Sequence, residues 1–454
     1  MNSASRPRQT RKSGNPTLAA ALASTLLLTG CGAVGTGGGG SVTLKLVAAD
    51  YGDTEATSTT HYWDDLVSRF EATNPGFKVS VEVVPWTDID KRVAELISSG
   101  KVPDVVQTGG YADQVAADRL YPAGDVLSID TQANMIDAFA KAGQVLGSQY
   151  GIPFVASTRV FVYNRTMFQK AGISAPPTTW EELRKDAELV KAKMPGTIPY
   201  ALPLGPEEAQ GESMIWTMSG GGTLADNAGN YSVDSQPNRD TFKWLRTNLV
   251  DRHLTYPDPS TVDRKTAFAD FASGKVAMLN GHPGLVAKAI ESKVDYGTAA
   301  IPRKDAGAKP TTLGVADWMM AFKANGHKTE IKKFLNFVYL KENTLRFDEQ
   351  YNLLPVTQDT KDEMTGSGKH QDLTEFLNAL PSANFYPLGD PSWDKVSVKL
   401  KEKIGAAVKA GGDDVLTQLQ AAAAQEASRA RAAGGGAGGG GGGAPRRGGG
   451  RGRG

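Results

Sequence analysis

The chain has 454 residues, 40% hydrophobic and 22% charged, which is the composition of a soluble globular protein with a sizeable core. Its net charge of +1 conceals an asymmetry, because ten of the 50 basic residues lie before Cys31 or after Ser428, where no acidic residue occurs. The body between these ends has 40 basic and 49 acidic residues, a balance that argues against nucleic acid as its ligand.

The N-terminus has the pattern of a secretory signal peptide. Basic residues precede an apolar run, Leu18–Leu28, that is too short to span a bilayer. The run ends in Leu28-Thr29-Gly30-Cys31, which resembles the bacterial lipobox, where the cysteine is acylated and becomes the mature N-terminus. Cys31 is the only cysteine, so no intramolecular disulfide is possible. The alternative is an ordinary signal peptide with an unrelated cysteine.

We expect residues 1–30 to be the signal peptide and the glycine-rich residues 31–41 to be a flexible tether. No later segment is apolar for long enough to span a membrane. The sequence therefore predicts a protein of the cell membrane, lipid-anchored on the extracellular face through Cys31, with palmitate among the attached groups.

Strands and helices alternate after the tether. Residues 42–48 and the alternating apolar positions of 77–83 predict strands, and residues 103–106 predict a third. Between them, the helical spacing of apolar residues predicts helices around 63–70 and 89–97. This order is typical of an α/β lobe with a mostly parallel sheet and with ligands at the carboxyl ends of its strands.

Residues 151–194 predict two strands, a short helix and a long helix. Gly151–Val155 and Val160–Tyr163 are the two apolar runs. Thr179 stands three residues before Glu182, a capping-box spacing in which each side chain binds an otherwise unpaired backbone N–H. Apolar residues at helical spacing follow this pair and predict the long helix.

The second half of the chain has less regular patterns. Residues 216–230 form a glycine-rich segment that we interpret as a turn, and no Gly-Lys-Ser/Thr follows to make it a phosphate-binding loop. Residues 313–318 precede a helix with apolar positions from 331 to 338. Residues 393–424 predict two terminal helices, and residues 429–454 a disordered Gly/Arg-rich tail, too poor in apolar residues to fold.

Several short motifs occur together in one order. They are Asn74-Pro75-Gly76, Ser98–Val106, Tyr150-Gly151-Ile152-Pro153, Tyr163-Asn164, Lys170-Ala171-Gly172-Ile173, Thr179–Leu183, Phe271–Met278 and Leu354-Pro355-Val356. Each motif alone is weakly specific. The series resembles the extracellular solute-binding proteins of ABC importers, in the maltose-binding-protein-like branch that mostly binds sugars, over roughly residues 42–428.

This resemblance implies an α/β, periplasmic-binding-protein-like fold with two lobes and a hinge formed by crossover segments. Residues 42–155 and 315–358 would form lobe 1, and residues 156–314 and 359–428 lobe 2. The implied function is capture of a carbohydrate, most often an oligosaccharide, and its delivery to the permease subunits of an importer. A polyol phosphate or a polyamine is the alternative ligand. We expect a monomer with no nucleic-acid partner, no cofactor and no metal.

A surface-anchored glycosidase is the alternative from another class, because two carboxylates can hydrolyse a glycosidic bond. The acidic pairs are Asp64-Asp65, Glu181-Glu182, Glu207-Glu208 and Asp413-Asp414. Neighbouring residues on a helix point about 100° apart, so such pairs do not converge on one bond. The five histidines lack metal-ligand spacing, and no G-x-S-x-G motif occurs. We therefore predict no enzymatic activity.

Candidate ligand residues are polar groups and rings at strand ends and crossovers, because sugars offer hydroxyl edges and apolar faces. In lobe 1 they are Asp50, Tyr51, Trp86, Asp88, Gln107, Thr108, Gly109, Gly110 and Tyr111. The first crossover offers Ser157, Thr158 and Arg159, and lobe 2 offers Trp216, Asn280, Gly281 and His282. The return crossover offers Gly314, Asp317 and Trp318, and the C-terminal segment offers Tyr386 and Trp393.

The tryptophans have competing interpretations. Those within helical apolar stripes are predicted to be core, namely Trp63, Trp180 and Trp244. Trp216 is open between core and ligand site. Trp318 is predicted to face the cleft, because Gly314 and Asp317 stand beside it at a crossover.

Two other side chains also leave alternatives open. Arg159 is predicted to contact ligand or line the cleft, with an ion pair between the lobes as the alternative. His282 suits loop scaffolding as well as ligand donation. Pro283 follows it where many relatives have a tryptophan, so no stacking ring is expected there.

Overall fold

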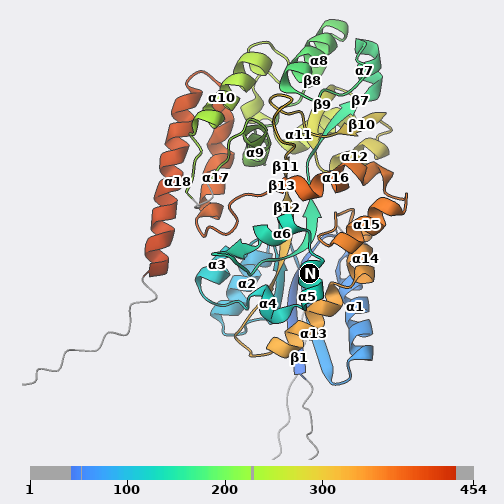
Figure 1. Cartoon of the computed structure of the whole chain (residues 1–454), viewed down its shortest axis with the longest axis vertical. Helices are drawn as coiled ribbons and strands as arrows, with labels where there is room; N and C mark the ends of the chain where they lie inside the picture. Colours follow the sequence, from blue (N-terminus) through green and yellow to red (C-terminus); the bar gives the residue numbers. More distant parts are fainter. Residues whose placement is uncertain (1–41, 53, 226–229, 436–454) are drawn as a thin grey trace, which may run out of the picture. The chain divides into compact units, whose positions relative to one another are not determined.

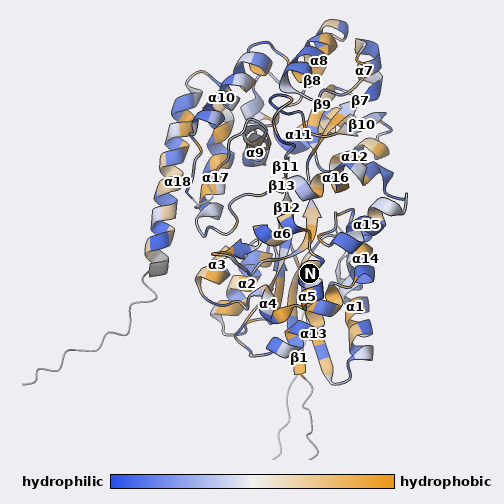
Figure 2. Cartoon of the chain, viewed as in Figure 1, coloured by the Kyte–Doolittle hydropathy of each residue, from blue (hydrophilic) through white to orange (hydrophobic). Residues whose placement is uncertain are grey.

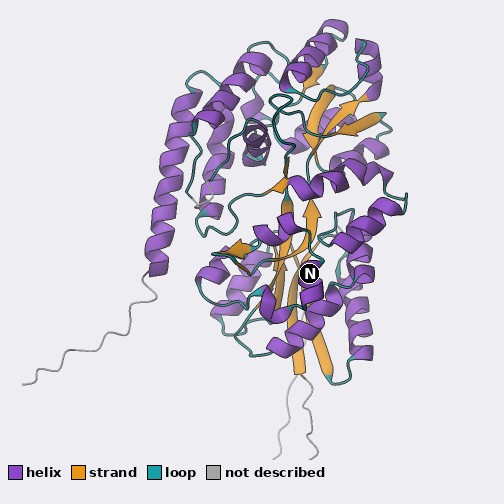
Figure 3. Ribbon diagram, viewed as in Figure 1, coloured by secondary structure: helices purple, strands orange, loops and turns teal. Residues whose placement is uncertain are grey.

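A computed structural model describes residues 42–52, 54–225 and 230–435, which form two lobes with a separate β-sheet in each (Figure 1, Figure 3). The expected signal peptide, Cys31 and the tether lie outside the described residues. Within the described ranges, no helix has both the length and the apolar character needed to cross a membrane.

The first sheet has five strands, of which one runs opposite to its neighbours. In space they run β2 (Phe77–Pro85), β1 (Val42–Asp50), β3 (Val105–Thr108), β12 (Val315–Ala321) and β6 (Ile152–Ser157). β1 is parallel to both β2 and β3, as the sequence predicts. β12 is antiparallel to its neighbours β3 and β6, because the chain enters the sheet from the other lobe at this point. The sheet is therefore mixed.

Helices pack around this sheet. They are α1 (Thr60–Thr73), α2 (Ile89–Ser98), α3 (Ala112–Ala116), α4 (Ala123–Val126), α5 (Ile129–Ala133), α6 (Asp137–Ala142), α13 (Lys328–Val338) and α14 (Lys341–Tyr351). A small hairpin, β4 (Gln144–Val145) and β5 (Ser148–Gln149), follows α6. The predicted apolar face of α1 is buried, and Trp63 stacks on Phe154 of β6 with ring centroids 5.6 Å apart. Trp63 is thus core, as predicted.

The second sheet has four strands, in the order β10 (Tyr296–Ala299), β7 (Val160–Asn164), β9 (Val276–Gly281) and β8 (Ile198–Tyr200). β7 is antiparallel to β10 and β9, and β8 is parallel to β9. The helices of this lobe are α7 (Arg165–Ala171), α8 (Trp180–Lys193), α9 (Ala209–Ser219), α10 (Gln236–Leu245), α11 (Arg264–Ala272), α12 (Pro283–Glu291), α16 (Thr374–Ala379), α17 (Trp393–Lys403) and α18 (Gly412–Gly435). α15 (Gln358–Gly366) contacts both α14 and α16.

The long helix α8 begins where the sequence predicts. Glu182 N donates to Thr179 Oγ1 at 3.3 Å, and Thr179 N donates to Glu182 Oε2 at 3.2 Å, so the capping box is formed. Trp180 is buried and packs against Trp216 and Trp244 with centroids 5.3 and 4.9 Å away. Buried apolar residues of this kind form the cores of both lobes, and the helices carry both hydrophilic and hydrophobic residues along their length (Figure 2).

Two predicted boundaries are wrong. The glycine-rich turn begins at Gly220, because Trp216–Ser219 complete the last turn of α9. The C-terminal tail begins later than residue 429, because α18 continues to Gly435. Arg429 Nη1 pairs with Glu426 Oε1 at 3.0 Å within that helix, which ties residue 429 to the folded body. Residues 436–454 lie outside the described residues.

Hydrogen bonds join the segments that lie at the boundary between the lobes. Thr158 and Arg159 link β6 to β7, while β11 (Thr312–Leu313) and β13 (Ala383–Asn384) form a parallel two-stranded ribbon. Thr312 Oγ1 accepts from Arg159 N at 2.9 Å and donates to Arg159 O at 2.6 Å. Thr158 Oγ1 donates to the carbonyl of Phe376 at 3.0 Å. Motion of one crossover is therefore coupled to the others.

Candidate functional site

The topology brings one edge of each sheet together. β6 ends at Ser157 and β7 starts at Val160, so only two residues separate the carboxyl edge of the first sheet from the second. The carboxyl ends of β1, β2 and β3 share that edge, because these strands are parallel to one another. In the second sheet Val160 pairs with Gly281, so the carboxyl end of β9 lies at the same boundary. Most of the candidate residues lie along these edges.

In the first lobe, Tyr51 is the centre of a hydrogen-bonded group. Its hydroxyl donates to Asp317 Oδ2 at 2.6 Å and accepts from Gln107 Nε2 at 2.8 Å. Gln107 Oε1 in turn accepts from the N–H of Ala49 at 2.9 Å. Burial raises the pKa of Asp317 to about 6, and the hydrogen bond from Tyr51 opposes that rise. Hydrogen bonds of the Tyr51 hydroxyl thus connect this residue, which directly follows β1, with residues from β3 and β12.

Trp86 is the exposed ring of this edge. Its side chain is 38% exposed and meets Tyr51 edge-on, with ring centroids 5.4 Å apart. Gly109 lies beside it, since a Cβ built there would be 3.7 Å from the Trp86 ring. Asp88 and Gly110 are also exposed. This part of the predicted site is accessible to a ligand.

The other acidic residues here also organise the loops. Asp50 Oδ1 accepts from Thr59 N at 2.8 Å and Asp50 Oδ2 from Ser58 Oγ at 2.8 Å. Burial raises the pKa of Asp50, but these bonds outweigh it and the net shift is downward. Thr108 is buried and donates to Asp90 Oδ1 at 2.8 Å. Asp50 and Thr108 therefore have structural partners already.

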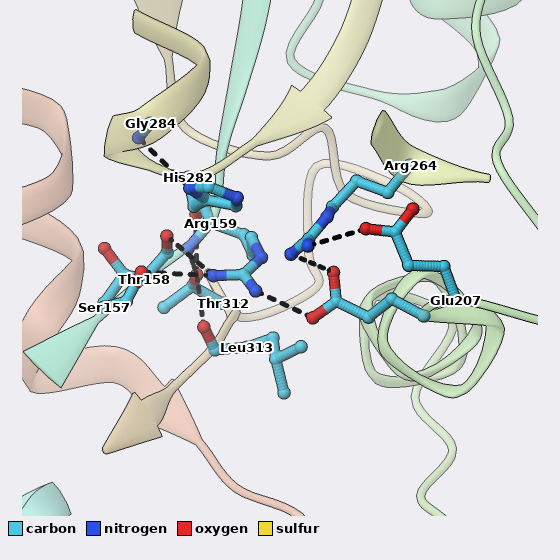
Figure 4. Close-up of polar contacts among 10 residues, drawn as sticks. Ser157, Thr158, Arg159, Glu207, Arg264, His282, Gly284, Thr312 and Leu313 are labelled. Atoms are coloured by element: carbon cyan, nitrogen blue, oxygen red, sulfur yellow. Dashed lines mark hydrogen bonds and ion pairs between the residues drawn. The ribbon is translucent and has the colours of Figure 1, made fainter. Parts of the chain in front are cut away.

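In the second lobe, two arginines share one carboxylate (Figure 4). Glu208 Oε1 pairs with Arg159 Nη2 at 2.9 Å, and Glu208 Oε2 pairs with Arg264 Nη1 at 2.7 Å. Arg264 Nη2 also pairs with Glu207 Oε1 at 2.9 Å. Arg159 Nη1 donates to Ser157 Oγ at 3.2 Å. Burial raises the pKa of Glu208, but the two guanidiniums outweigh it and lower the pKa overall.

Glu212, one turn into α9, lies behind these ion pairs. Its Oε1 accepts from Trp216 Nε1 at 2.9 Å, Asn280 Nδ2 at 3.1 Å and Tyr200 Oη at 3.2 Å. Burial raises the pKa of Glu212 to about 7, although the three hydrogen bonds oppose the rise. Glu212 is thus a second carboxyl group, after Glu208, close to the first crossover.

His282 serves as a helix cap. Its Nδ1 accepts from the N–H of Gly284 at 3.1 Å, at the start of α12 (Figure 4). Burial, and then the charges of Arg159 and Arg264, hold its pKa well below the usual 6.5. The ring is therefore neutral at neutral pH, and the scaffolding interpretation accounts for its contacts.

Several candidate side chains are buried, which corrects the expectation that they face open cleft. Trp318 is 0% exposed and packs edge-on against Tyr111, itself 2% exposed. A Cβ on Gly143 or Gly151 would lie 3.1 or 3.0 Å from the Trp318 ring, so both glycines give it space. Trp216 is 3% exposed and belongs to the tryptophan cluster of the second lobe. The prediction for Trp318 is wrong in this respect.

The C-terminal ring pair is also largely enclosed. Trp393 is 5% exposed and stacks on Tyr386 with ring centroids 4.9 Å apart. Gly281 and Gly314 are buried, and a Cβ on either would meet a side chain within 2.4 or 2.7 Å. Thr158 is buried and bound to Phe376, as described above. These residues are buried beneath the surface of the candidate site and support the residues that form it.

The two lobes present acidic groups to each other near α17. The pKa of Asp394, at the first turn of α17, is raised by burial and then by the charges of Asp113 and Asp90. Asp90 and Asp113 begin α2 and α3 in the first lobe. Carboxylates of both lobes thus act on one another here, and the charge of Lys401 partly offsets them.

Sequence reasoning missed three residues of the second lobe: Glu208 as a partner of Arg159, Glu212 and Arg264. The pair Glu207-Glu208 was expected not to converge, yet both carboxylates meet Arg264, because they precede α9 and do not follow helical geometry. Nothing in the sequence connects Arg264 with residues 56 positions away. Among the described residues, no three His, Cys, Asp or Glu side chains group closely enough to hold a metal ion.

Comparison with known proteins gives a consistent result. The sequence profile of the family described as bacterial extracellular solute-binding protein matches residues 56–345. A binding protein of Brucella abortus is 30% identical over 78% of this chain and 85% of its own length. The multiple sugar-binding protein of Streptococcus mutans is 28% identical over 60% of this chain and 66% of its own length.

Two further similarities concern ligand class and fold. The sn-glycerol-3-phosphate-binding periplasmic protein of Escherichia coli is 26% identical over 69% of this chain and 78% of its own length. The crystal structure of the cyclic alpha-maltosyl-1,6-maltose binding protein from Arthrobacter globiformis aligns with a TM-score of 0.74 at 19% identity. The alignment covers 86% of this chain and all of that one, so the two share a fold.

Proposed function

Since the chain belongs to the bacterial extracellular solute-binding protein family, we propose that it captures a carbohydrate between its lobes and delivers it to an ABC importer. The carbohydrate is an oligosaccharide, and the receiving partner is the importer's permease in the membrane. The chain acts by binding alone and performs no catalysis.

One observation carries this proposal. Trp86 exposes an aromatic ring at the carboxyl edge of the first sheet, next to hydrogen-bonded polar groups and opposite the second lobe. An exposed ring beside fixed polar groups suits a sugar, whose C–H face stacks on aromatics while its hydroxyls form hydrogen bonds. The names of the Streptococcus and Arthrobacter proteins point to the same ligand class.

A polyol phosphate is the second candidate, favoured by the similarity to the glycerol-phosphate-binding protein. Phosphate sites use arginines whose guanidinium groups are free to bind the anion. Here Arg159 and Arg264 already pair with Glu208 and Glu207, and the charges of Asp90 and Asp113 act on Asp394. This charge balance favours a neutral, hydroxylated ligand over an anion.

Capture works through the hinge. A ligand that contacts both lobes stabilises the closed arrangement over the open one by its differential affinity for the two. The crossovers at Thr158-Arg159 and β11 are hydrogen-bonded together, so their rotation moves the lobes as bodies. The closed, loaded form is the one that the permease would recognise.

Membrane attachment through Cys31 is also part of the proposal. A Cys31→Ser variant should be released from the membrane fraction while its ligand affinity stays unchanged, because the anchor is separated from the body by a tether. Retention of the cleaved variant in membranes would contradict the lipid anchor.

A thermal-shift screen tests the ligand class. The purified body, residues 42–435, is heated with mono- and oligosaccharides, glycerol 3-phosphate and spermidine. Binding to the native state raises stability by RT ln(1 + [L]/Kd), so a saccharide at 100 times its Kd adds about 2.7 kcal/mol. Analysis of the recovered sugar for cleavage checks the glycosidase alternative. A rise with glycerol 3-phosphate alone would overturn the proposal.

A further inference from the structure

A small polar pocket lies behind the ion pairs of the second lobe. We call it the Glu212 pocket, and Glu208, Gly211, Glu212, Arg264 and Asn280 are the lining residues that matter here. Its volume is about 10 Å³, room for about one water-sized group. The pocket lies next to Arg159 of the first crossover, and thus at the boundary between the lobes.

One acceptor atom in this pocket is buried without a donor, and one oxygen of Glu212 takes part in none of the hydrogen bonds described above. Asn280 is 5% exposed, and its Oδ1 is buried without a hydrogen-bond partner among the described residues. The amide orientation is fixed, because Asn280 Nδ2 donates to Glu212 Oε1. All three donors to Glu212 bind Oε1, which leaves Oε2 with none of them. A buried acceptor without a donor costs about 1–3 kcal/mol, so the pocket suits a group that supplies O–H.

The charges around the pocket select a neutral group. Arg159 and Arg264 flank it with positive charge, which disfavours an ammonium group. The charged carboxylate of Glu208 disfavours a carboxylate or phosphate. A hydroxyl donates one proton and accepts hydrogen bonds, and it fits a space for one water-sized group.

We propose that the Glu212 pocket receives the hydroxymethyl group of a hexose unit, so that the protein prefers hexose over pentose oligosaccharides. The hydroxymethyl arm is the one group that projects from a hexopyranose ring on a flexible bond, and a pentopyranose lacks it. Its O–H donates to Asn280 Oδ1 or Glu212 Oε2. This inference rests on the proposed carbohydrate function and names the substrate class of the same site.

Gly211 keeps the pocket open. A Cβ at this position would lie 2.9 Å from both Glu208 Cγ and Tyr386 Oη, closer than carbon atoms normally approach. Tyr386 Oη is itself buried without a hydrogen-bond partner among the described residues. An alanine here therefore fills space in the pocket without removing any polar group. The neighbouring atoms belong to side chains, so they can move and the fold tolerates the change.

The test is isothermal titration calorimetry with two series of probes. Maltotriose, cellotriose and mannotriose represent hexoses, and xylotriose and xylotetraose, which are built from pentopyranose units, represent pentoses. The proteins are the unmodified chain, Gly211→Ala, Glu212→Gln and the control Gly366→Ala. Gly366 matches Gly211 as a helical glycine but has open space around its Cβ position. Melting curves confirm that each variant is folded.

The unmodified chain and Gly366→Ala should bind the best hexose probe at least about tenfold more tightly than either pentose probe. Gly211→Ala and Glu212→Gln should lose that preference, mainly by weakening hexose binding. Equal affinity of the unmodified chain for both series, or a preference that survives both variants, would overturn the inference while leaving carbohydrate binding intact. If the unmodified chain binds no probe of either series and no saccharide of the thermal screen, the proposed function itself fails.

Discussion

At the scale of single residues, burial separates the aromatic side chains that can meet a ligand from those that cannot. Trp86 is 38% exposed, while Trp318, Trp216 and Trp393 are at most 5% exposed. Trp318 was expected at the cleft because Asp317 precedes it. Successive strand residues point to opposite faces, so a site position for Asp317 implies a core position for its neighbour.

Trp86→Ala should weaken oligosaccharide binding by about 1–3 kcal/mol, because a central aromatic anchor is lost. The melting temperature should change little, since the ring is partly solvated already. Calorimetry measures the affinity. Leu189→Ala in α8 is a matched control, because Leu189 is 41% exposed and lies outside the site. Equal affinity of the two variants would remove Trp86 from the ligand site.

Trp318→Ala should destabilise the protein by about 3–5 kcal/mol, the range for truncating a buried aromatic residue. The sequence alone predicted that this ring faces the cleft, and the complete burial of the ring reverses that expectation. Urea denaturation gives the free energy of unfolding. A variant with unchanged stability and reduced affinity would restore the original interpretation.

Glu212 makes stability depend on pH. Its pKa is about 7 in the folded protein because of burial, whereas an unfolded Glu titrates near about 4.3. The native state binds this proton more tightly, so the stabilisation is complete below about pH 4 and is lost as pH rises through about 7. Glu212→Gln does not titrate. Its stability relative to the unmodified chain should rise on the order of 3 kcal/mol between pH 4 and pH 8.

Urea unfolding of both proteins across this pH range gives the difference directly. A constant difference in free energy would mean that Glu212 ionises normally in the folded protein.

At the scale of elements, local pattern predicted several strands and helices of the chain, mainly those with clear apolar periodicity. β1, β2, β3, α1, α2 and α8 lie where apolar periodicity and capping signals indicate. Local pattern fails where contacts between residues far apart in the sequence determine the structure. The antiparallel direction of β12 depends on the return of the chain from the second lobe. The meeting of Arg159, Glu208 and Arg264 depends on three separate elements, which leave no local signal.

The capping box of α8 gives a prediction at this scale. Thr179→Ala should destabilise the protein by about 1 kcal/mol, because the N–H of Glu182 loses its acceptor. Thr365→Ala in α15 is the control, since that exposed hydroxyl donates only to the carbonyl of Lys361. Urea denaturation compares the two. Equal midpoints for both variants would show that the cap contributes nothing.

At the scale of the whole molecule, two sheets joined by crossover segments explain why the candidate residues come from distant parts of the sequence. We propose that lobe 1 comprises residues 42–155 and 315–358, and lobe 2 residues 156–314 and 359–435. Hydrogen bonds of Thr312 and Thr158 join the crossovers, so the lobes can rotate as bodies about them. The sugar preference follows from side-chain positions, which the sequence did not predict.

The central claim is that a saccharide closes one lobe on the other. Spin labels at Ala116→Cys in α3 and Lys395→Cys in α17 report on this, because the acidic residues of these two helices act on each other across the lobes. The labels are introduced into a Cys31→Ser chain, which has no other cysteine. Electron paramagnetic resonance then measures the distance between them. We predict a shorter distance with saturating oligosaccharide and no change with glycerol 3-phosphate; saccharide binding with an unchanged distance would contradict the account.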